Sequence, residues 1–387
     1  MEPHERDRLL TCAEINEAEE AEFANGADAE HLMEAVGERM AMAIQAYFPT
    51  PGSVIAFVGA GHNGGDALVV ARLLGELDWE VFVRPAVEVS GFRPLTAKKL
   101  EEVGELGTEW DGDTGLLPDD PRPVVILDGL LGIGAKGPLR PGYLEAGAEM
   151  NALRLAEMAT TFALDVPSGV DGDTGEVHEE AVVADFTLTI GYAKPGLVAD
   201  EALDNVGRIF VVPFPEVEAL PGQGDATRAV VTARSVGRVL PRRSFSSHKG
   251  RVGRVAIVAG SRGLTGAASL CAMGALRGGA GLVTVFVPKE VYTIVAAAAP
   301  AEVMVTPYHL PHEIDLDRYD VVAVGPGMGT SIEARAMLEY AVHFRGPMVI
   351  DADGLNLLAC GGLEPLSRPP GPRLLTPHPG EMARMAG

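Results

Sequence analysis

The sequence predicts an α/β protein with two doubly wound domains, each a mainly parallel sheet with helices on both faces. In both halves of the 387 residues, short β-branched runs alternate with helical stretches. This alternation is the pattern of successive βαβ units, which form parallel sheets that are covered on both faces. A Pro- and Gly-rich segment between the halves has the composition of a linker.

The first half is expected to begin with two helices within residues 13–47, where apolar positions recur at helical spacing before Pro49 and Pro51. Strands and helices then alternate as far as the linker. We assign residues 1–222 to this domain and residues 223–228 to the linker. The expected strands are 53–58, 80–83, 124–127, 162–164, 184–190 and 208–213, with helices at 65–77, 94–106 and 142–158.

The second half, residues 229–387, repeats the alternation and is expected to form the second domain. The similarity between the halves is one of fold class, because no short-period repeat is visible. The expected strands are 255–258, 282–287, 303–305, 321–324, 347–350 and 373–375, with helices at 265–278 and 331–343.

The charge balance excludes whole classes of partner. Thirty-one Lys and Arg face 54 Asp and Glu, a net charge of −23, which repels nucleic acids and anionic membranes. Ten of the acids lie in residues 1–30, where we expect a solvated helix face, with a partner-binding tail as the alternative. The three cysteines have no motif spacing, and neither a signal peptide nor a membrane span is visible. We therefore expect a cytoplasmic protein, and a homo-oligomer.

A glycine-rich loop, Gly59–Asp66, directly follows the first strand and fits G-x-G-x-x-G, as in Rossmann-like domains. Glycines allow a sharp turn and close approach to a phosphate, and the following helix N-terminus supplies free N–H groups. A purely structural turn is the alternative. The polar residues His62, Asn63 and Asp66 within the loop favour a binding site.

Two further strand ends carry carboxylates, Asp128 and Asp165. Because ligands gather at the carboxyl ends of strands in open α/β sheets, we expect both loops to meet the glycine loop in one site. Asn63, Asp128 and Ser168 offer only oxygen ligands, which suit a hard cation better than zinc.

These residues resemble the NAD(P)H-hydrate epimerase domain over residues 11–215. The family loop reads G-x-G-N-N-G-G-D-G, from which His62 and Ala67 depart. Residues 32–37, 132–138, 165–169 and 173–175 match as well. The resemblance implies interconversion of the R and S hydrates NADHX and NADPHX at C6 of the nicotinamide ring.

The resemblance also implies which residues act. Asn63, Asp128 and Ser168 would hold a potassium ion. Asp165 and Lys136 are our candidates for acid–base catalysis, and a lysine with only an electrostatic role is the alternative. The implied substrate-binding residues are His62, Asn63, Gly64, Gly65, Asp66, Gly132, Ile133, Gly134, Ala135, Lys136, Gly137, Pro138 and Asp165.

The second half carries loops at four strand ends, residues 260–267, 325–329, 351–356 and 376–381. Together with His248-Lys249-Gly250 they resemble the ADP-dependent (in some relatives ATP-dependent) NAD(P)H-hydrate dehydratase domain, which has a ribokinase-like fold. The resemblance implies that a nucleotide phosphorylates the C6 hydroxyl and that loss of phosphate restores the ring. The implied pocket residues are Ala267, Gly327 and His378.

Family members continue with a K-G-containing strand that binds the adenine nucleotide and a G-T-G-D turn. No such turn follows a strand before Gly387. We therefore expect an incomplete second domain with an unpaired sheet edge, few ADP-binding residues and little or no dehydratase activity.

The leading hypothesis is thus a bifunctional metabolite-repair enzyme. One rival is an NADP-linked oxidoreductase that uses the Gly59–Asp66 loop. The second strand lacks the usual ribose-binding acid, but Arg84 could hold a 2′-phosphate. Another rival is a non-catalytic nucleotide-binding or scaffold protein. Exchange of the R and S hydrates without net redox change would distinguish the hypothesis from both rivals.

Overall fold

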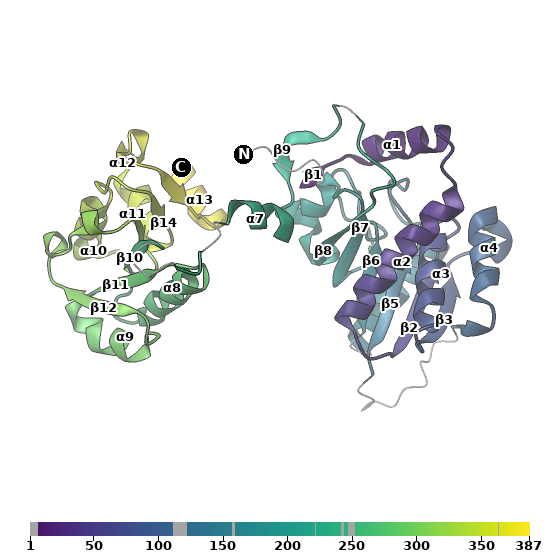
Figure 1. Ribbon diagram of the computed structural model, residues 1–387, viewed down its shortest axis with the longest axis horizontal. Coiled ribbons are helices and arrows are strands. Elements are labelled where there is room, and N and C mark those ends of the chain that lie inside the picture. The colour runs from purple at the N-terminus through teal and green to yellow at the C-terminus, as the bar shows by residue number, and fades with distance from the viewer. Residues whose placement is uncertain are drawn as a thin grey trace. The chain divides into compact units, whose positions relative to one another are not determined.

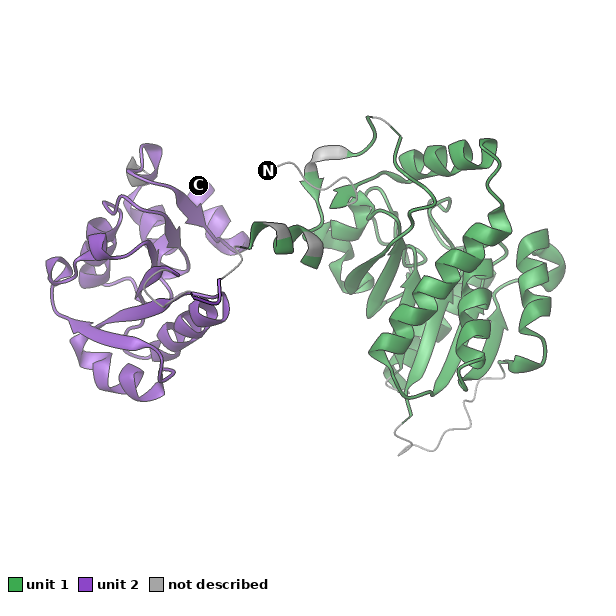
Figure 2. Ribbon diagram, in the orientation of Figure 1, with its two compact units in different colours: residues 1–240 green, residues 241–387 purple. Residues whose placement is uncertain are grey.

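The computed structural model describes residues 7–110, 122–156, 159–220, 222–240, 244–246, 252–362 and 364–387. It divides into two compact units, residues 1–240 and 241–387 (Figure 2). Each unit contains a parallel sheet interleaved with helices, so the predicted α/β fold class is confirmed. No described helix has the length and apolar character that crossing a membrane requires.

The first unit contains a seven-stranded parallel sheet in the order β4-β3-β2-β5-β6-β7-β8 (Figure 1). The chain starts in the middle, at β2, and moves outward first to one side and then, from β5, to the other. The strands are β2 (Ser53–Val58), β3 (Glu80–Pro85), β4 (Gly107–Glu109), β5 (Val124–Gly129), β6 (Thr160–Leu164), β7 (Phe186–Ile190) and β8 (Arg208–Val212). The helices are α1 (Cys12–Ala24), α2 (Ala29–Tyr47), α3 (His62–Gly75), α4 (Pro94–Val103), α5 (Pro141–Ala156) and α6 (Leu203–Val206).

Both faces of this sheet are buried. Val54 and Val58 of β2 pack with α2 and α3, whereas Ile55 and Phe57 pack with α5 on the opposite face. Figure 1 shows α2 and α3 lying across one face of the sheet. The continuous apolar run in β2 follows from this arrangement, because alternate side chains enter different cores.

The helix starts differ in a way that matters for the site. Thr11 and Glu14 form a capping box at α1, and the Asp28 side chain caps α2. Helix α3 begins after Gly61 without a side-chain cap. Its first N–H groups are therefore left for a ligand or water.

The expected linker at residues 223–228 is wrong. Asp225–Ala229 form strand β9, which pairs antiparallel with β1 (Arg8–Leu9), and α7 (Ala233–Val239) follows. The Glu14 side chain also accepts a hydrogen bond from the Gly224 N–H at 2.9 Å. The prolines and glycines thus serve turns that return the chain to its N-terminal strand. The two units divide after Leu240 instead.

The second unit contains a six-stranded parallel sheet in the order β12-β11-β10-β13-β14-β15, with β15 at one edge. Helices α8 and α9 contribute to the core on one face, and α10 and α11 to the core on the other. The strands are β10 (Arg254–Val258), β11 (Leu282–Pro288), β12 (Met304–Tyr308), β13 (Val321–Val324), β14 (Met348–Ile350) and β15 (Arg373–Leu375). The helices are α8 (Thr265–Arg277), α9 (Tyr292–Ala298), α10 (Ile332–Ala341), α11 (Asp353–Gly361), α12 (Glu364–Ser367) and α13 (Pro379–Ala386).

Candidate functional site

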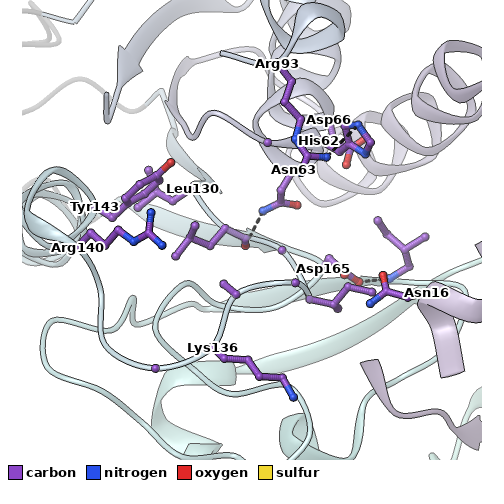
Figure 3. A pocket seen from close by; sticks show the side chains of 18 of the residues that line it. Asn16, His62, Asn63, Asp66, Arg93, Leu130, Lys136, Arg140, Tyr143 and Asp165 are labelled. Carbon is purple, nitrogen blue, oxygen red and sulfur yellow. Dashed lines mark hydrogen bonds between the residues drawn. The ribbon is translucent and has the colours of Figure 1, made fainter. Parts of the chain in front are cut away.

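A cavity of about 780 Å³ lies at the carboxyl ends of β2, β5 and β6 in the first unit (Figure 3). It sits where the strand order changes direction, the position that ligands take in open α/β sheets. The glycine loop and the loops after β5 and β6 all contribute to it, as the sequence predicted. The predicted residues that line it are His62, Asn63, Asp66, Asp165 and residues 132–138.

The three glycines of the G-x-G-x-x-G pattern, Gly59, Gly61 and Gly64, have different structural roles. A Cβ atom at Gly59 would overlap the Leu130 carbonyl oxygen, and one at Gly64 would overlap the Gly59 carbonyl oxygen. Only Gly61, which lines the cavity, has open space around its Cβ position. Two glycines therefore bring β2, α3 and the β5 loop together, and one leaves room for a ligand.

Two predicted substrate-binding residues, Gly64 and Gly65, are buried inside α3 and are not among the residues that line the cavity. A Cβ atom at Gly65 would lie 2.7 Å from the Met33 sulfur, so this glycine serves packing between α2 and α3. Ala67 is completely buried, and its methyl group takes the space that a side chain at Gly129 would need. This departure from the family loop therefore does not reach the cavity.

Asp165 is held in an unusual conformation at the end of β6. Its φ angle is +70°, a region that L-residues rarely adopt and that costs about 1–3 kcal/mol. Its Oδ1 accepts a hydrogen bond from the Ile190 N–H at 3.0 Å and one from the Nζ of Lys194. Lys194 is completely buried, and its Nζ also donates to Thr189 Oγ1 at 2.9 Å. Asp165 is therefore paired with a buried cation and has a fixed position.

The lysine that pairs with Asp165 is thus Lys194, which the sequence analysis did not name. Lys136 lines the cavity but is exposed. Backbone hydrogen bonds hold the pKa of Asp171 below its usual range, and the Lys136 charge contributes to that shift. Lys136 therefore remains a candidate for binding charge in the cavity rather than for sharing a proton with Asp165.

Two more carboxyl groups face the same cavity. Burial raises the pKa of Asp66 well above its usual range, and the nearby Asp165 and Glu19 carboxylates add to that shift. Burial also raises the pKa of Glu19 to about 7, again with a contribution from Asp165. Carboxyl groups with such values can donate a proton near neutral pH.

Three cations also line the cavity, Arg93, Arg140 and Lys136, and none of them forms an ion pair with a described carboxylate. Arg93 Nη1 lies 3.5 Å from His62 Nε2, and burial together with the Arg93 charge lowers the pKa of His62. Figure 3 shows Arg140 on the opposite side of the view from Asp66 and Asp165. In a chain with 23 excess negative charges, exposed cations that line a cavity and pair with no described carboxylate favour an anionic ligand.

The three predicted potassium ligands lie around the backbone of residues 130–131. Asn63 Nδ2 donates to the Leu131 carbonyl at 2.9 Å, and Ser168 Oγ accepts from the Leu131 N–H at 3.0 Å. Asp128 is completely buried, accepts hydrogen bonds from Ser168 Oγ and N at 2.7 Å each, and pairs with no described cation. Burial raises its pKa to about 6. A buried carboxylate without a counter-charge, amid amide and hydroxyl oxygens, fits a hard monovalent cation.

Sequence reasoning missed Glu19, which lines the cavity, and Lys194, which pairs with the lining residue Asp165. Glu19 was placed on a solvated helix face, although it follows the buried Cys12 by seven positions and Ile15 by four and so shares their face of α1. Lys194 follows β7 in the run Gly191-Tyr-Ala-Lys-Pro-Gly196, and its place after a strand end was the available signal. The other missed lining residues are Asn16, Arg93, Leu130, Leu131, Arg140, Tyr143 and Ile190.

Arg84, which would bind a 2′-phosphate in the oxidoreductase hypothesis, already interacts with other residues of the protein. Its Nε pairs with the Glu149 carboxylate at 3.0 Å, and its Nη1 donates to the Pro85 carbonyl at 2.6 Å. It is not among the residues that line the cavity. The arrangement therefore gives that hypothesis no support.

In the second unit, the predicted loops also meet where the strand order reverses. The Gly260 N–H donates to the Pro326 carbonyl at 2.9 Å, and a Cβ atom at Gly327 would lie 2.8 Å from the Ala267 Cβ. Ala267 and Gly327 are therefore neighbours, as expected. His378 caps α13 by accepting from the Gly380 N–H at 3.1 Å, with an exposed ring. His248 and Lys249 lie outside the described residues.

Comparisons with known proteins match both units. The family described as "YjeF-related protein N-terminus" matches residues 29–196, and the family described as "NAD(P)H-hydrate dehydratase" matches residues 255–387. The second match shows that the dehydratase domain is present. The prediction that this domain is truncated and has lost its activity is therefore not supported.

Relatives of similar organisation cover nearly the whole chain. A bifunctional NAD(P)H-hydrate repair enzyme from Gloeobacter violaceus is 38% identical over 97% of this chain and 75% of the relative. Enzymes of the same description from Thermosynechococcus vestitus and Escherichia coli are 34% and 33% identical, over 97% and 92% of this chain and 74% and 67% of the relatives.

A solved structure, an ADP/ATP-dependent NAD(P)H-hydrate dehydratase from Bacillus subtilis co-crystallised with ATP and Mg²⁺, is also similar to part of the chain. It is 29% identical with a TM-score of 0.35, and the alignment covers 40% of this chain and 54% of that one.

Proposed function

The chain belongs to the family of bifunctional NAD(P)H-hydrate repair enzymes, and from this premise we propose that its first unit interconverts the R and S epimers of NAD(P)H hydrate at C6. One observation carries the proposal. The cavity lies where the strand order reverses between β2 and β5, a place that we call the β2–β5 crossing, and it combines cations that pair with no described carboxylate with acids of raised pKa. A dinucleotide hydrate has the matching parts, because its phosphates are anionic and its damaged ring exchanges a hydroxyl group.

The binding end of the cavity suits the phosphates. Its volume of about 780 Å³ falls within the range of about 300–1,000 Å³ that is typical of small-molecule sites. The uncapped start of α3 offers free N–H groups and the positive end of its dipole. Arg93, Arg140 and Lys136 supply positive charge without a competing carboxylate among the described residues.

The reacting end suits a change of configuration at C6. The reaction needs a proton for the departing hydroxyl group and a base for the water that returns on the other face. Asp165, which pairs with the buried Lys194, is our candidate base. Lys136, exposed on the same cavity, is assigned to binding of the substrate's negative charge.

A potassium ion would be held by Asn63, Asp128 and Ser168. Its charge would compensate the buried Asp128 carboxylate and hold the loop that begins at Leu130 against the start of α3. Residues 130–138 of this loop line the cavity, so the ion would help to hold the shape of the site.

The test uses the purified full chain with one separated epimer of NADHX and no added nucleotide, followed by chromatography over time. We expect the other epimer to form at a rate far above the spontaneous one, with no net oxidation or reduction. Asp165→Asn should lower kcat by about 10²-fold or more, as for loss of a general base. No acceleration by the wild-type chain would refute the proposal, and an unchanged Asp165→Asn rate would remove this residue from the mechanism.

We propose a second activity, nucleotide-dependent dehydration of the S hydrate, for the second unit. The convergence of the β10 and β13 loops at Gly260 and Pro326, with Ala267 and Gly327 beside them, supports it. ADP or ATP added with S-NADHX should yield the absorbance of reduced nicotinamide. Gly327→Val, which fills the space beside Ala267, should abolish that signal while epimerisation continues. The absence of any signal with either nucleotide would refute this second proposal.

A further inference from the structure

We propose that Glu19 is a catalytic residue of the first unit, and that its carboxyl group and that of Asp66 hold the proton that is passed to the departing C6 hydroxyl group. This inference rests on the proposed epimerase function. Both side chains line the cavity that contains Asp165, but they come from different helices, α1 and α3. Glu19 also lies outside residues 29–196, the part of the chain that matches the N-terminal family.

Glu19 reaches the cavity because of its position on α1. Cys12, Ile15 and Ala18 form the buried face of this helix, and Glu19 lies four positions after Ile15 on that face. Its carboxyl group is near enough to Asp165 and Lys194 for both charges to act on it. The next residue, Glu20, lies on the solvent side of α1 and is exposed.

Asp66 is a buried acid without a hydrogen-bond donor. It is 9% exposed, lines the cavity, and accepts no hydrogen bond from any described residue. An ionised carboxylate in such a place costs several kcal/mol. The neutral acid is therefore favoured in the empty cavity, and its proton is available to a ligand.

The charges around Glu19, Asp66 and Asp165 leave one proton to be shared by Glu19 and Asp66. Lys194 supplies one buried positive charge and pairs with Asp165. Glu19 and Asp66 have no ion-pair partner among the described residues, and their like charges oppose joint ionisation. The nearby Cys12 thiol stays neutral because burial raises its pKa to about 12. His62, at the start of α3, and Arg93, directly before α4, also line the cavity.

The chemical step balances without a redox partner. The shared proton moves to the C6 hydroxyl oxygen, the C6–O bond breaks with its electron pair on oxygen, and water leaves as the N1 lone pair forms an N1=C6 iminium bond. A solvent water then adds to C6 from the opposite face, the π pair returns to N1, and Asp165 takes the proton that the water loses. Proton exchange with solvent restores the starting protonation of the carboxyl groups.

The test compares Glu19→Gln with the matched control Glu20→Gln in the full chain, with one epimer of NADHX as substrate. We expect kcat to fall by about 10²-fold in Glu19→Gln with KM nearly unchanged, and both constants to stay at wild-type values in Glu20→Gln. Circular dichroism checks that each variant is folded. Glu19→Asp serves as a second variant, which keeps the carboxyl group but shortens the side chain by one methylene group.

The pH profile gives a readout that a structural role would not change. In the wild type, kcat should fall as the pH rises through the range in which the Glu19–Asp66 pair loses its shared proton. Removal of the Glu19 charge lowers the pKa of Asp66, so this limb should move to lower pH in Glu19→Gln. A combined Glu19→Gln and Asp66→Asn variant should lose little more than Asp66→Asn alone, because the two groups act as one unit.

The outcomes separate the inference from the function on which it rests. If the wild type fails to epimerise NADHX, the proposed function falls and this inference falls with it. If the wild type is active and Glu19→Gln keeps its kcat and its pH limb, only the inference is overturned. A rise in KM alone would also overturn it, because that result assigns Glu19 to binding.

Discussion

The two units share one topological feature but differ in what they place there. In each sheet the strand order reverses between two neighbouring strands, β2 and β5 in the first unit and β10 and β13 in the second. At the β2–β5 crossing of the first unit lies a cavity of about 780 Å³ that is lined by buried acids. At the second, the backbones of Gly260 and Pro326 are joined by a hydrogen bond. The strand order therefore determines where each site lies, and the buried charged groups determine which reaction that site can support.

A strained residue follows the strand next to each crossing, β6 in the first unit and β14 in the second, and shows the same contrast. Asp165 has a φ angle of +70° and carries a carboxylate paired with Lys194. Ala352 has a φ angle of +50° and carries only a methyl group, while the following Asp353 accepts the Gly329 N–H at 2.8 Å. In the first unit the strained residue, Asp165, itself carries the reactive group. In the second unit the strained Ala352 turns the chain, and the next residue, Asp353, holds the loop at Gly329.

The largest expected effect comes from removing the buried cation of the first crossing. Lys194→Met leaves Asp165 without its partner, so we expect the first unit to lose about 3–5 kcal/mol of unfolding free energy and epimerase activity to fall with it. Both tryptophans, Trp79 and Trp110, are buried in the first unit, so their fluorescence during urea unfolding reports on this unit.

Two variants make this prediction specific. Adding Asp165→Asn to Lys194→Met removes the stranded charge and should recover most of the stability without recovering activity. Lys136→Met removes an exposed lysine from the same cavity and should leave the unfolding midpoint unchanged. A Lys194→Met chain as stable as the wild type would show that the pair contributes nothing to the fold.

A second prediction concerns how closely the backbones approach at the first crossing. Gly59→Ala places a methyl group on the Leu130 carbonyl oxygen, so we expect a loss of about 2–3 kcal/mol in the tryptophan-detected transition. Gly61→Ala is the matched control, because its Cβ would enter open space. It should change stability by less than about 0.5 kcal/mol but weaken substrate binding. Equal losses in both variants would contradict the division of tasks between these glycines.

These glycines show how far the sequence could predict the site. The run after β2 predicted the crossing, and the strand-end rule brought Asp128 and Asp165 to it, because parallel strands end on one edge. The rule says nothing about which glycine packs and which faces the ligand. That depends on the Leu130 backbone, about 70 positions away in the chain.

The lysine and the glutamate could not be found in the same way. Lys136 is predicted because residues 132–138 match the family loop, whereas Lys194 pairs with Asp165 through its burial, which the local sequence does not show. Glu19 lies among exposed acids such as Glu17 and Glu20 and is distinguished only by the helical phase of Cys12 and Ile15.

A third prediction follows from the sign of the Glu19 shift. Burial raises its pKa from 4.5 to about 7 in the folded state, so folding favours the protonated form. The stabilising contribution is complete below pH 4.5 and is lost as the pH rises to about 7. Between these limits we expect Glu19→Gln to gain about 3 kcal/mol relative to the wild type. Urea unfolding at pH 4.5 and pH 7.5 measures this, with Glu20→Gln as the control that should show no relative gain. A constant difference between Glu19→Gln and the wild type would contradict the shift.

The smallest effect concerns the cation proposed at Asp128. An ion that binds only the folded chain stabilises it by about 1.4 kcal/mol at ten times its dissociation constant. Replacement of potassium by tetramethylammonium at equal ionic strength should therefore lower the tryptophan-detected unfolding free energy of the wild type by about 1 kcal/mol. In Asp128→Asn the carboxylate that calls for a counter-charge is gone, so the difference between the two salts should vanish. Asp353→Asn, at the second crossing, keeps the first site intact and should retain the full salt difference. If Asp128→Asn retained it as well, the ion would act elsewhere in the chain, and the first crossing would owe its order to hydrogen bonds alone.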